Sequence, residues 1–118
     1  MKPLFLQYPL CSTCQKAKKW LTDNGIEYTN RLIVENPPTK EELKKWIAQS
    51  KLPIKKFFNT NGVVYKEMQL STKLAFMSED EQIKLLTTNG KLVKRPLLVT
   101  ESHVLVGFKS DEWKNLLK

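Results

Sequence analysis

The chain has 118 residues, of which 41% are hydrophobic and 27% charged, and its formal net charge is +8. This length and composition are typical of one globular domain that builds its core without stabilising disulfides. No apolar run is long enough for a signal peptide or a membrane span, so we expect a cytoplasmic protein with no membrane contact. The 18 lysines and two arginines are spread along the chain, which favours an ordinary solvated surface over direct nucleic-acid binding.

The first 36 residues alternate between strand and helix patterns. Pro3–Tyr8 is short and apolar and predicts a strand. A helical pattern follows from Cys11 and ends at Asn24-Gly25, where glycine can take the left-handed conformation. Ile26–Val34 predicts a second strand, so these elements form a βαβ unit with parallel strands. The apolar positions of the helix are Cys14, Ala17 and Leu21.

Residues 37–90 carry the signals of helices alone. Thr39–Glu42 and Ser78–Glu81 are capping boxes, and each predicts a helix start. Ser71 is the predicted cap of a further helix, and Asn89-Gly90 ends the last one. The side chains expected to be buried here are Leu43, Trp46, Ile47, Phe57, Phe58, Leu74, Met77, Ile83, Leu85 and Leu86.

The strand pattern returns near the C-terminus. Pro96–Thr100 and His103–Val106 predict an antiparallel hairpin, and Ser110 is the predicted cap of a final helix. The apolar face of that helix would consist of Trp113, Leu116 and Leu117. We therefore predict a single α/β domain over residues 1–118. Residues 1–36 and 91–118 would form a four-stranded mixed sheet with its helices, and residues 37–90 an all-helical insertion.

The two cysteines of the chain, Cys11 and Cys14, lie at the start of the first predicted helix. Unpaired N–H groups and the helix dipole stabilise a thiolate at such a position, and side chains three residues apart on a helix are neighbours. These features favour Cys11 as the activated nucleophile and the inward-facing Cys14 as the resolving thiol. A CxxC that opens the helix of a βαβ unit is typical of a thioredoxin-like redox site.

Other interpretations of the cysteine pair are a metal site and two inert thiols. Structural zinc sites use four ligands, whereas this chain offers His103 as its one histidine and has no third thiol. We expect no metal and no cofactor. Two inert buried thiols remain an open alternative to the redox site.

Arg95-Pro96 precedes the predicted hairpin. In a thioredoxin-like sheet this loop lies against the start of the CxxC helix, and its proline is commonly cis. Arg95 would then bring a permanent charge near the thiols. The alternative is a surface arginine before the proline of an edge strand, and the spacing alone does not decide between them.

The motifs YPxCxxCxKAxxWL and KRPLL, at this chain length, resemble the arsenate reductase-like (ArsC/Spx) family, in particular its small CxxC-containing branch. The resemblance implies a thioredoxin-like fold with a helical insertion. It also implies that Cys11 is the nucleophile, that Cys14 is the second cysteine of the redox-switch members and that Arg95 binds an oxyanion. Arsenate reductases of this type have two further arginines, and the corresponding positions here are Asn59 and Phe108. Fewer charge-assisted hydrogen bonds to a doubly charged oxyanion imply poor arsenate reduction.

These observations predict a cytoplasmic thiol–disulfide redox protein, either an oxidoreductase or a redox sensor, that uses the Cys11–Cys14 dithiol. Thioredoxin, glutaredoxin or a low-molecular-weight thiol would reduce it again. The resemblance leaves two alternatives: a redox-switched transcription regulator that binds RNA polymerase, and a glutaredoxin-type arsenate reductase. The regulators carry a glycine in the region that is Gln49–Pro53 here, and this chain lacks it. We expect the protein to be a monomer.

Overall fold

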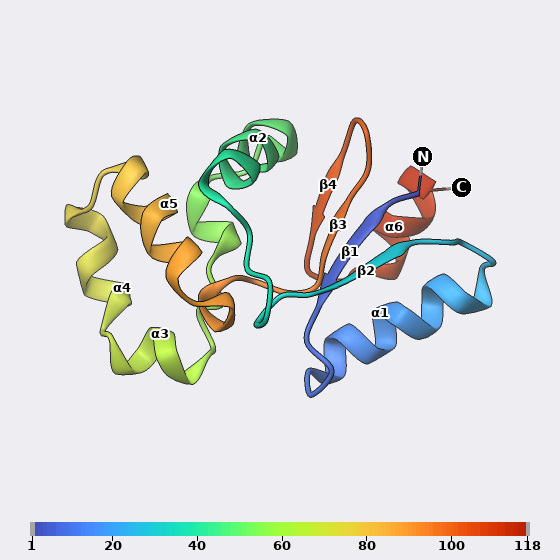
Figure 1. Ribbon diagram of the computed structural model, residues 1–118, viewed down its shortest axis with the longest axis horizontal. Coiled ribbons are helices and arrows are strands. Elements are labelled where there is room, and N and C mark those ends of the chain that lie inside the picture. The colour runs from blue at the N-terminus through green and yellow to red at the C-terminus, as the bar shows by residue number, and fades with distance from the viewer. Residues whose placement is uncertain (1, 118) are drawn as a thin grey trace.

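The computed structural model describes residues 2–117, and it shows a four-stranded sheet beside a lobe of helices (Figure 1). The strands are β1 (Leu4–Gln7), β2 (Thr29–Leu32), β3 (Leu97–Val99) and β4 (Val104–Val106), and their order in the sheet is β2-β1-β3-β4. The β1–β2 pair is parallel, whereas β1–β3 and β3–β4 are antiparallel. The predicted mixed sheet, with its βαβ unit and its hairpin, is therefore confirmed.

Helices α1 (Ser12–Asp23) and α6 (Ser110–Leu117) cover one face of the sheet. Side chains alternate across a strand, so Phe5 of β1 faces these helices and its neighbour Leu6 faces the lobe. Trp113 of α6 is fully buried there and makes an edge-on ring contact with Phe5. This aromatic packing fixes α1, and hence its N-terminus, against the sheet.

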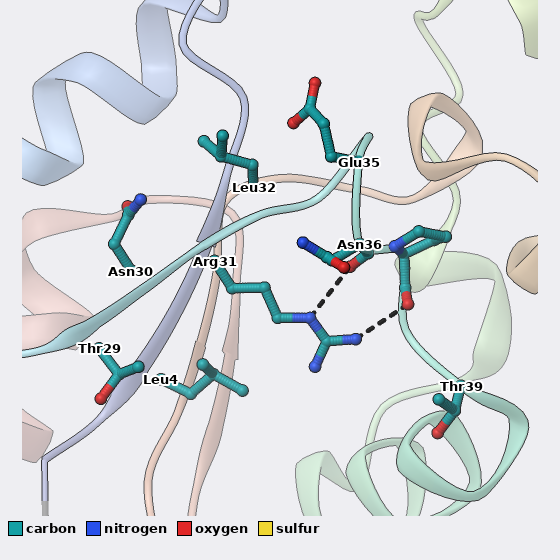
Figure 2. Close-up of a pocket in the computed structure, with 9 residues that line it drawn as sticks. Leu4, Thr29, Asn30, Arg31, Leu32, Glu35, Asn36 and Thr39 are labelled. Carbon is teal, nitrogen blue, oxygen red and sulfur yellow. Dashed lines mark hydrogen bonds between the residues drawn. The ribbon is translucent and has the colours of Figure 1, made fainter.

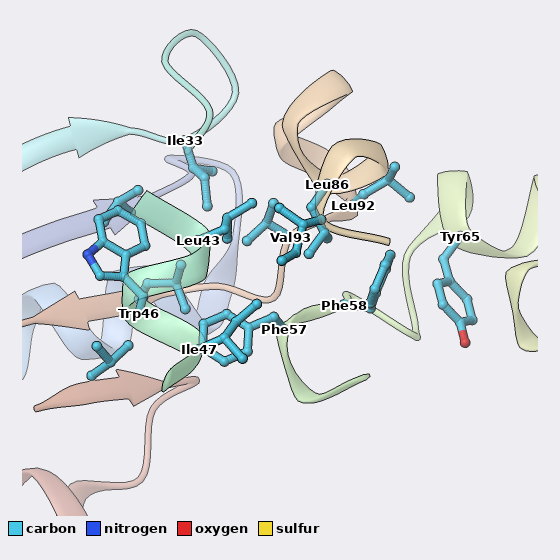
Figure 3. Packing of buried hydrophobic residues seen from close by; sticks show 14 of the residues in the cluster. Ile33, Leu43, Trp46, Ile47, Phe57, Phe58, Tyr65, Leu86, Leu92 and Val93 are labelled. Carbon is cyan, nitrogen blue, oxygen red and sulfur yellow. The ribbon is translucent and has the colours of Figure 1, made fainter. Parts of the chain in front are cut away.

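The lobe lies on the other face of the sheet, as the left half of Figure 1 shows. Its apolar side chains continue the cluster that begins at Leu6 of the sheet, and Figure 3 shows Leu43, Phe57 and Val93 among them. Sheet and lobe therefore share one packed core. The helical segments between β2 and β3 are α2 (Lys40–Ser50), η1 (Ile54–Phe57), α3 (Val63–Glu67), α4 (Leu70–Lys73), η2 (Leu74–Phe76), α5 (Glu79–Thr88) and η3 (Gly90–Leu92).

Both predicted capping boxes are present. The Thr39 side chain accepts from the Glu42 N–H and begins α2, and Ser78 does the same with Glu81 at the start of α5. Gly25 follows the end of α1 with φ 66°, which is the predicted left-handed conformation. Local sequence signals therefore set these helix ends.

Three local predictions were wrong. Ser71 does not cap a helix, because the chain turns at Gln69 (φ 55°), whose carbonyl already accepts the N–H groups of Thr72 and Lys73. The last helix starts at Ser110 itself, one residue earlier than a Ser110 cap predicts, since the Trp113 N–H donates to the carbonyl of Lys109. Leu116 is 42% exposed and does not belong to the buried face of α6.

The chain returns from the lobe to the sheet through η3, where Gly90 lies directly on the backbone of Ile33. A Cβ at Gly90 would stand 2.0 Å from the Ile33 carbonyl oxygen, so no side chain fits there. Just beyond, Phe58 and Val93 form an isolated β-bridge, and the Lys94 N–H donates to the Phe57 carbonyl at 2.7 Å. These contacts hold the chain immediately before Arg95. Among the described residues no helix has the length and apolar character needed to cross a membrane.

Candidate functional site: the Cys11–Cys14 dithiol

Cys11 occupies the N-cap of α1. Its backbone is extended (φ −90°, ψ 118°), and its N–H donates to the Tyr8 carbonyl at 3.0 Å, which closes the turn between β1 and α1. The Sγ of Cys11 accepts a hydrogen bond from the Cys14 N–H at 3.4 Å. The first turn of α1 contains no acidic residue. The sulfur thus takes the place that a serine or aspartate oxygen takes in an ordinary cap, where negative charge is favoured.

Cys14 lies one turn into the helix and is fully buried, while Cys11 is half-buried. Both thiols are free. The Sγ of Cys14 accepts from the Tyr8 N–H at 3.5 Å. The inward position expected for Cys14 is therefore present, and the more accessible sulfur is that of Cys11.

The two thiols differ in acidity. Partial burial acts to raise the pKa of Cys11, but hydrogen bonds from Cys14 and Arg95, together with the charge of Arg95, outweigh it and leave the pKa below its ordinary value. Burial is also the main cause at Cys14, where it raises the pKa to about 12. The neighbouring Cys11 raises the pKa of Cys14 further, against smaller lowering contributions from the Tyr8 N–H and from Arg95. The site therefore favours one thiolate, on Cys11, and one protonated thiol, on Cys14.

Arg95 lies beside the thiols, which decides between the two placements left open by the sequence. It precedes Pro96 through a cis peptide bond, as expected for this loop. Its guanidinium carbon stands 4.8 Å from the centroid of the Tyr8 ring, a cation–π contact. The Nε and Nη1 atoms of Arg95 are buried and have no hydrogen-bond partner among the described residues. Two N–H donors close to the Cys11 thiol are thus available to a further group.

The two positions where the family resemblance places arginines are committed to other contacts. The Phe108 ring packs edge-on against Trp113 at a centroid distance of 4.9 Å. The Asn59 side chain donates to the Lys91 carbonyl at 3.4 Å. Neither position supplies a cation, so Arg95 is the one arginine that the structure brings to the thiols.

A second polar cluster, which sequence reasoning missed, joins β2 to α2. Arg31 Nη1 and Nη2 donate to the two carboxylate oxygens of Glu42 at 2.7 and 2.9 Å. Figure 2 shows its remaining contacts, in which Nε donates to the Asn36 carbonyl and Nη2 to the Pro37 carbonyl, beside a cavity of about 730 Å³. Partial burial acts to raise the pKa of Glu42, but the hydrogen bonds from Arg31 and Thr39 hold it below its ordinary value. The capping-box role of Glu42 was a usable signal, but nothing local links it to Arg31.

The Cys11–Cys14 dithiol and the Arg31–Glu42 cluster lie at different places in the sheet, and only the first contains a nucleophile. Within residues 2–117 no three histidine, cysteine or acidic side chains gather where they could hold a metal ion. A buried and a half-buried cysteine at the first helix of a βαβ-containing mixed sheet define a dithiol protein of thioredoxin-like fold.

Comparison with known proteins places the chain within this class. The family model described as "ArsC family" matches residues 6–116, so the chain belongs to the ArsC family. An ArsC family related protein from Bacteroides fragilis has 73% identity and a TM-score of 0.95, with 98% of each chain covered. The uncharacterized protein YusI of Bacillus subtilis is 51% identical over 97% of both chains. The regulatory protein MgsR of the same organism is 32% identical over 97% of this chain and 89% of its own. The predicted family and the thioredoxin-like fold are confirmed.

Proposed function

We propose that the protein is a thiol–disulfide redox protein in which Cys11 attacks and Cys14 resolves. The observation that carries this proposal is the contrast between the two sulfurs, with the pKa of Cys11 lowered and that of Cys14 raised to about 12. The thiolate is the reactive form of a cysteine, so at neutral pH the attack comes from Cys11.

The exchange proceeds in two balanced steps. The Cys11 thiolate attacks one sulfur of a partner disulfide, forms a mixed disulfide and expels the other sulfur as a thiolate. Cys14 then loses its proton to that thiolate or to water, attacks the Cys11 sulfur and expels the second thiolate of the partner. The partner gains two electrons and the protein gains the Cys11–Cys14 disulfide. A cytoplasmic thiol reductant, such as thioredoxin, glutaredoxin or a low-molecular-weight thiol, reverses the two steps.

Thiol counting with mass measurement tests this proposal. Free thiols should fall from two to zero after mild oxidation, the mass should stay that of a monomer, and reductant should restore both thiols. Cys14→Ser is the matched control, because it should stop at a mixed disulfide or an intermolecular dimer. Two free thiols that persist under the oxidant would contradict the proposal.

A redox-switched regulator is the second candidate, and its support is the 32% identity to MgsR, which is named a regulatory protein. For this candidate the relevant partner is RNA polymerase. Polymerase subunits retained from an extract by the oxidised protein, but not by Cys11→Ser, would support it. Equal retention by both forms, or none, would leave the oxidoreductase.

Arsenate reduction is a weaker candidate because Arg95 is alone at the thiols. A doubly charged oxyanion there would lack the contacts of two further arginines, since Asn59 and Phe108 occupy those positions. We expect little turnover in assays coupled to glutaredoxin or thioredoxin. Saturable reduction at micromolar arsenate would show that other groups hold the oxyanion.

A further inference from the structure

A cavity of about 620 Å³ lies between the lobe and the C-terminal end of β4, and four lysines line it. Lys55 and Lys56 come from η1, Lys94 precedes Arg95, and Lys109 precedes α6. None of these four ammonium groups forms an ion pair within residues 2–117. We call this cavity, with its four lysines, the lysine cavity.

The walls of the lysine cavity are held in place. Lys94 is fixed through its backbone N–H, which donates to the Phe57 carbonyl at 2.7 Å, and the Asn59 N–H donates to the Leu92 carbonyl at the same distance. The Lys94 side chain passes close to Gly107, where an added Cβ would stand 3.5 Å from Lys94 Cε. Leu52 and Val106 add apolar surface to the lining. The cavity thus offers preformed positive charge beside apolar groups, which is the usual composition of a binding site.

The lysine cavity adjoins the thiol site. Lys94 lines the cavity and the next residue, Arg95, lowers the pKa of Cys11, so consecutive residues with Cα atoms about 3.8 Å apart belong to the two sites. On the other side of the thiols, Leu10 is 82% exposed directly before Cys11. A large exposed apolar side chain beside a nucleophile is suited to a macromolecular contact. A small anion in the cavity would leave Leu10 uncovered.

We propose that the lysine cavity is the docking site for an acidic segment of a protein partner, one that carries Asp or Glu residues around an apolar side chain. Charge complementarity argues for this occupant. Four lysines face the cavity with a single acidic residue, Glu112, and the whole chain carries a net charge of +8. The inference deepens the proposed function, because it gives the chemistry of the partner that would meet Cys11, but the binding itself needs neither thiol.

Fluorescence anisotropy with a labelled, cysteine-free peptide tests the proposal. In the peptide, Glu and Asp flank one leucine, and a second peptide replaces every Glu by Gln and every Asp by Asn. The full chain carries Cys11→Ser, which removes any covalent capture. We expect the acidic peptide to bind at least about tenfold more tightly than its amide counterpart, with the difference shrinking as salt rises.

Two matched double variants locate the binding. Lys55→Gln with Lys109→Gln should weaken binding of the acidic peptide by about tenfold. Lys73→Gln with Lys84→Gln, at exposed positions outside the cavity, removes the same charge and should change it less than about twofold. Circular dichroism checks that each variant is folded. Equal losses in the two double variants, or equal affinity for the two peptides, would overturn the proposal.

Two further outcomes separate this inference from its alternatives. Saturable binding of ATP by the cavity without any binding of the acidic peptide would overturn it in favour of a small organic anion. Thiol counting on the parent protein separates it from the proposed function. Peptide binding by a protein whose thiols never pair would support the docking site and contradict the redox proposal. Thiols that pair normally in a protein without selective peptide binding would overturn the docking site alone.

Discussion

The two arginines of the chain sit in opposite situations. Arg31 gives its donors to both Glu42 oxygens and to the carbonyls of Asn36 and Pro37. Arg95 keeps two buried donors without a partner and rests on the Tyr8 ring. A buried donor that lacks a partner costs about 1–3 kcal/mol, so nothing in the packing favours Arg95 as a stabilising residue. Full pairing marks the arginine that holds the fold together, and missing partners mark the one available for chemistry.

The largest expected effect is on stability. Arg31→Met should lower the free energy of unfolding by about 2–3 kcal/mol, because it leaves the partly buried Glu42 carboxylate without its counterion. Arg95→Met should change it by less than about 1 kcal/mol, since it removes donors that had no partner. Urea denaturation under reducing conditions measures both. Equal losses in the two variants would abolish the distinction between the arginines.

The second expectation concerns the reactivity of Cys11. Arg95→Ala should raise the pKa of Cys11, because it removes a hydrogen bond and a positive charge, and alkylation below neutral pH should slow roughly three- to tenfold. The pKa should stay below that of an ordinary cysteine, since the Cys14 N–H and the helix N-terminus remain. Iodoacetamide modification rates against pH, in a Cys14→Ser background, provide the measurement.

Arg31→Ala is the control for that experiment and should leave the Cys11 profile unchanged. High salt should reduce the effect of Arg95→Ala, because exposed charge pairs are screened over about 10 Å at 0.1 M. A profile of Arg95→Ala that overlays the parent would mean that Arg95 does not act on the thiol.

The Arg31–Glu42 pair should also be visible in the pH dependence of stability. The pKa of Glu42 is lowered in the folded state, so the unfolded state binds more protons at acidic pH. The stabilisation by Glu42 is thus fully present above its ordinary value of 4.5 and is lost as pH falls through the lowered pKa. The difference in unfolding free energy between the parent and Glu42→Gln, about 1–2 kcal/mol at pH 7, should therefore shrink below pH 4.5. A difference that stays constant with pH would exclude this linkage.

The smallest expected effect tests how Arg95 is held. Tyr8→Leu removes the ring under the guanidinium and should cost about 0.5–1 kcal/mol of cation–π attraction, which lets Arg95 move and raises the pKa of Cys11 slightly. Tyr8→Phe keeps the ring and should match the parent in the same alkylation profile. If Tyr8→Phe and Tyr8→Leu behave alike, the ring does not position Arg95.

The parts of the fold that local sequence signals specify were predictable. The capping boxes at Thr39 and Ser78, the glycine after α1 and the alternation in the strands were each visible over a few residues, and the structure has all of them. The cap position of Cys11 belongs to this group, since it follows from a strand, a turn and a helix in succession. These features depend on backbone groups only a few positions away.

Contacts between distant segments were not predictable in the same way. The pairing of Arg31 with Glu42, the Tyr8 ring under Arg95 and the bridge between Phe58 and Val93 join residues that share no periodic pattern. Ser71 was misassigned for a related reason, because a left-handed turn at Gln69 is unusual for a residue other than glycine. The sequence therefore specified which side of α1 carries the thiols, whereas the charge that acts on them came from the tertiary fold.

Gly90 has a consequence for how the chain can vary. Its missing side chain lets the strand end at Ile33 and the returning segment touch backbone to backbone. Even an alanine would push this segment outward, and the displaced chain leads within five residues to Arg95. A position that touches neither sulfur would then alter the acidity of Cys11. Substitutions at Gly90 should consequently be rejected for two reasons at once, loss of packing and a mistuned thiol, although the residue would look like an ordinary turn glycine to anyone who inspected the dithiol alone.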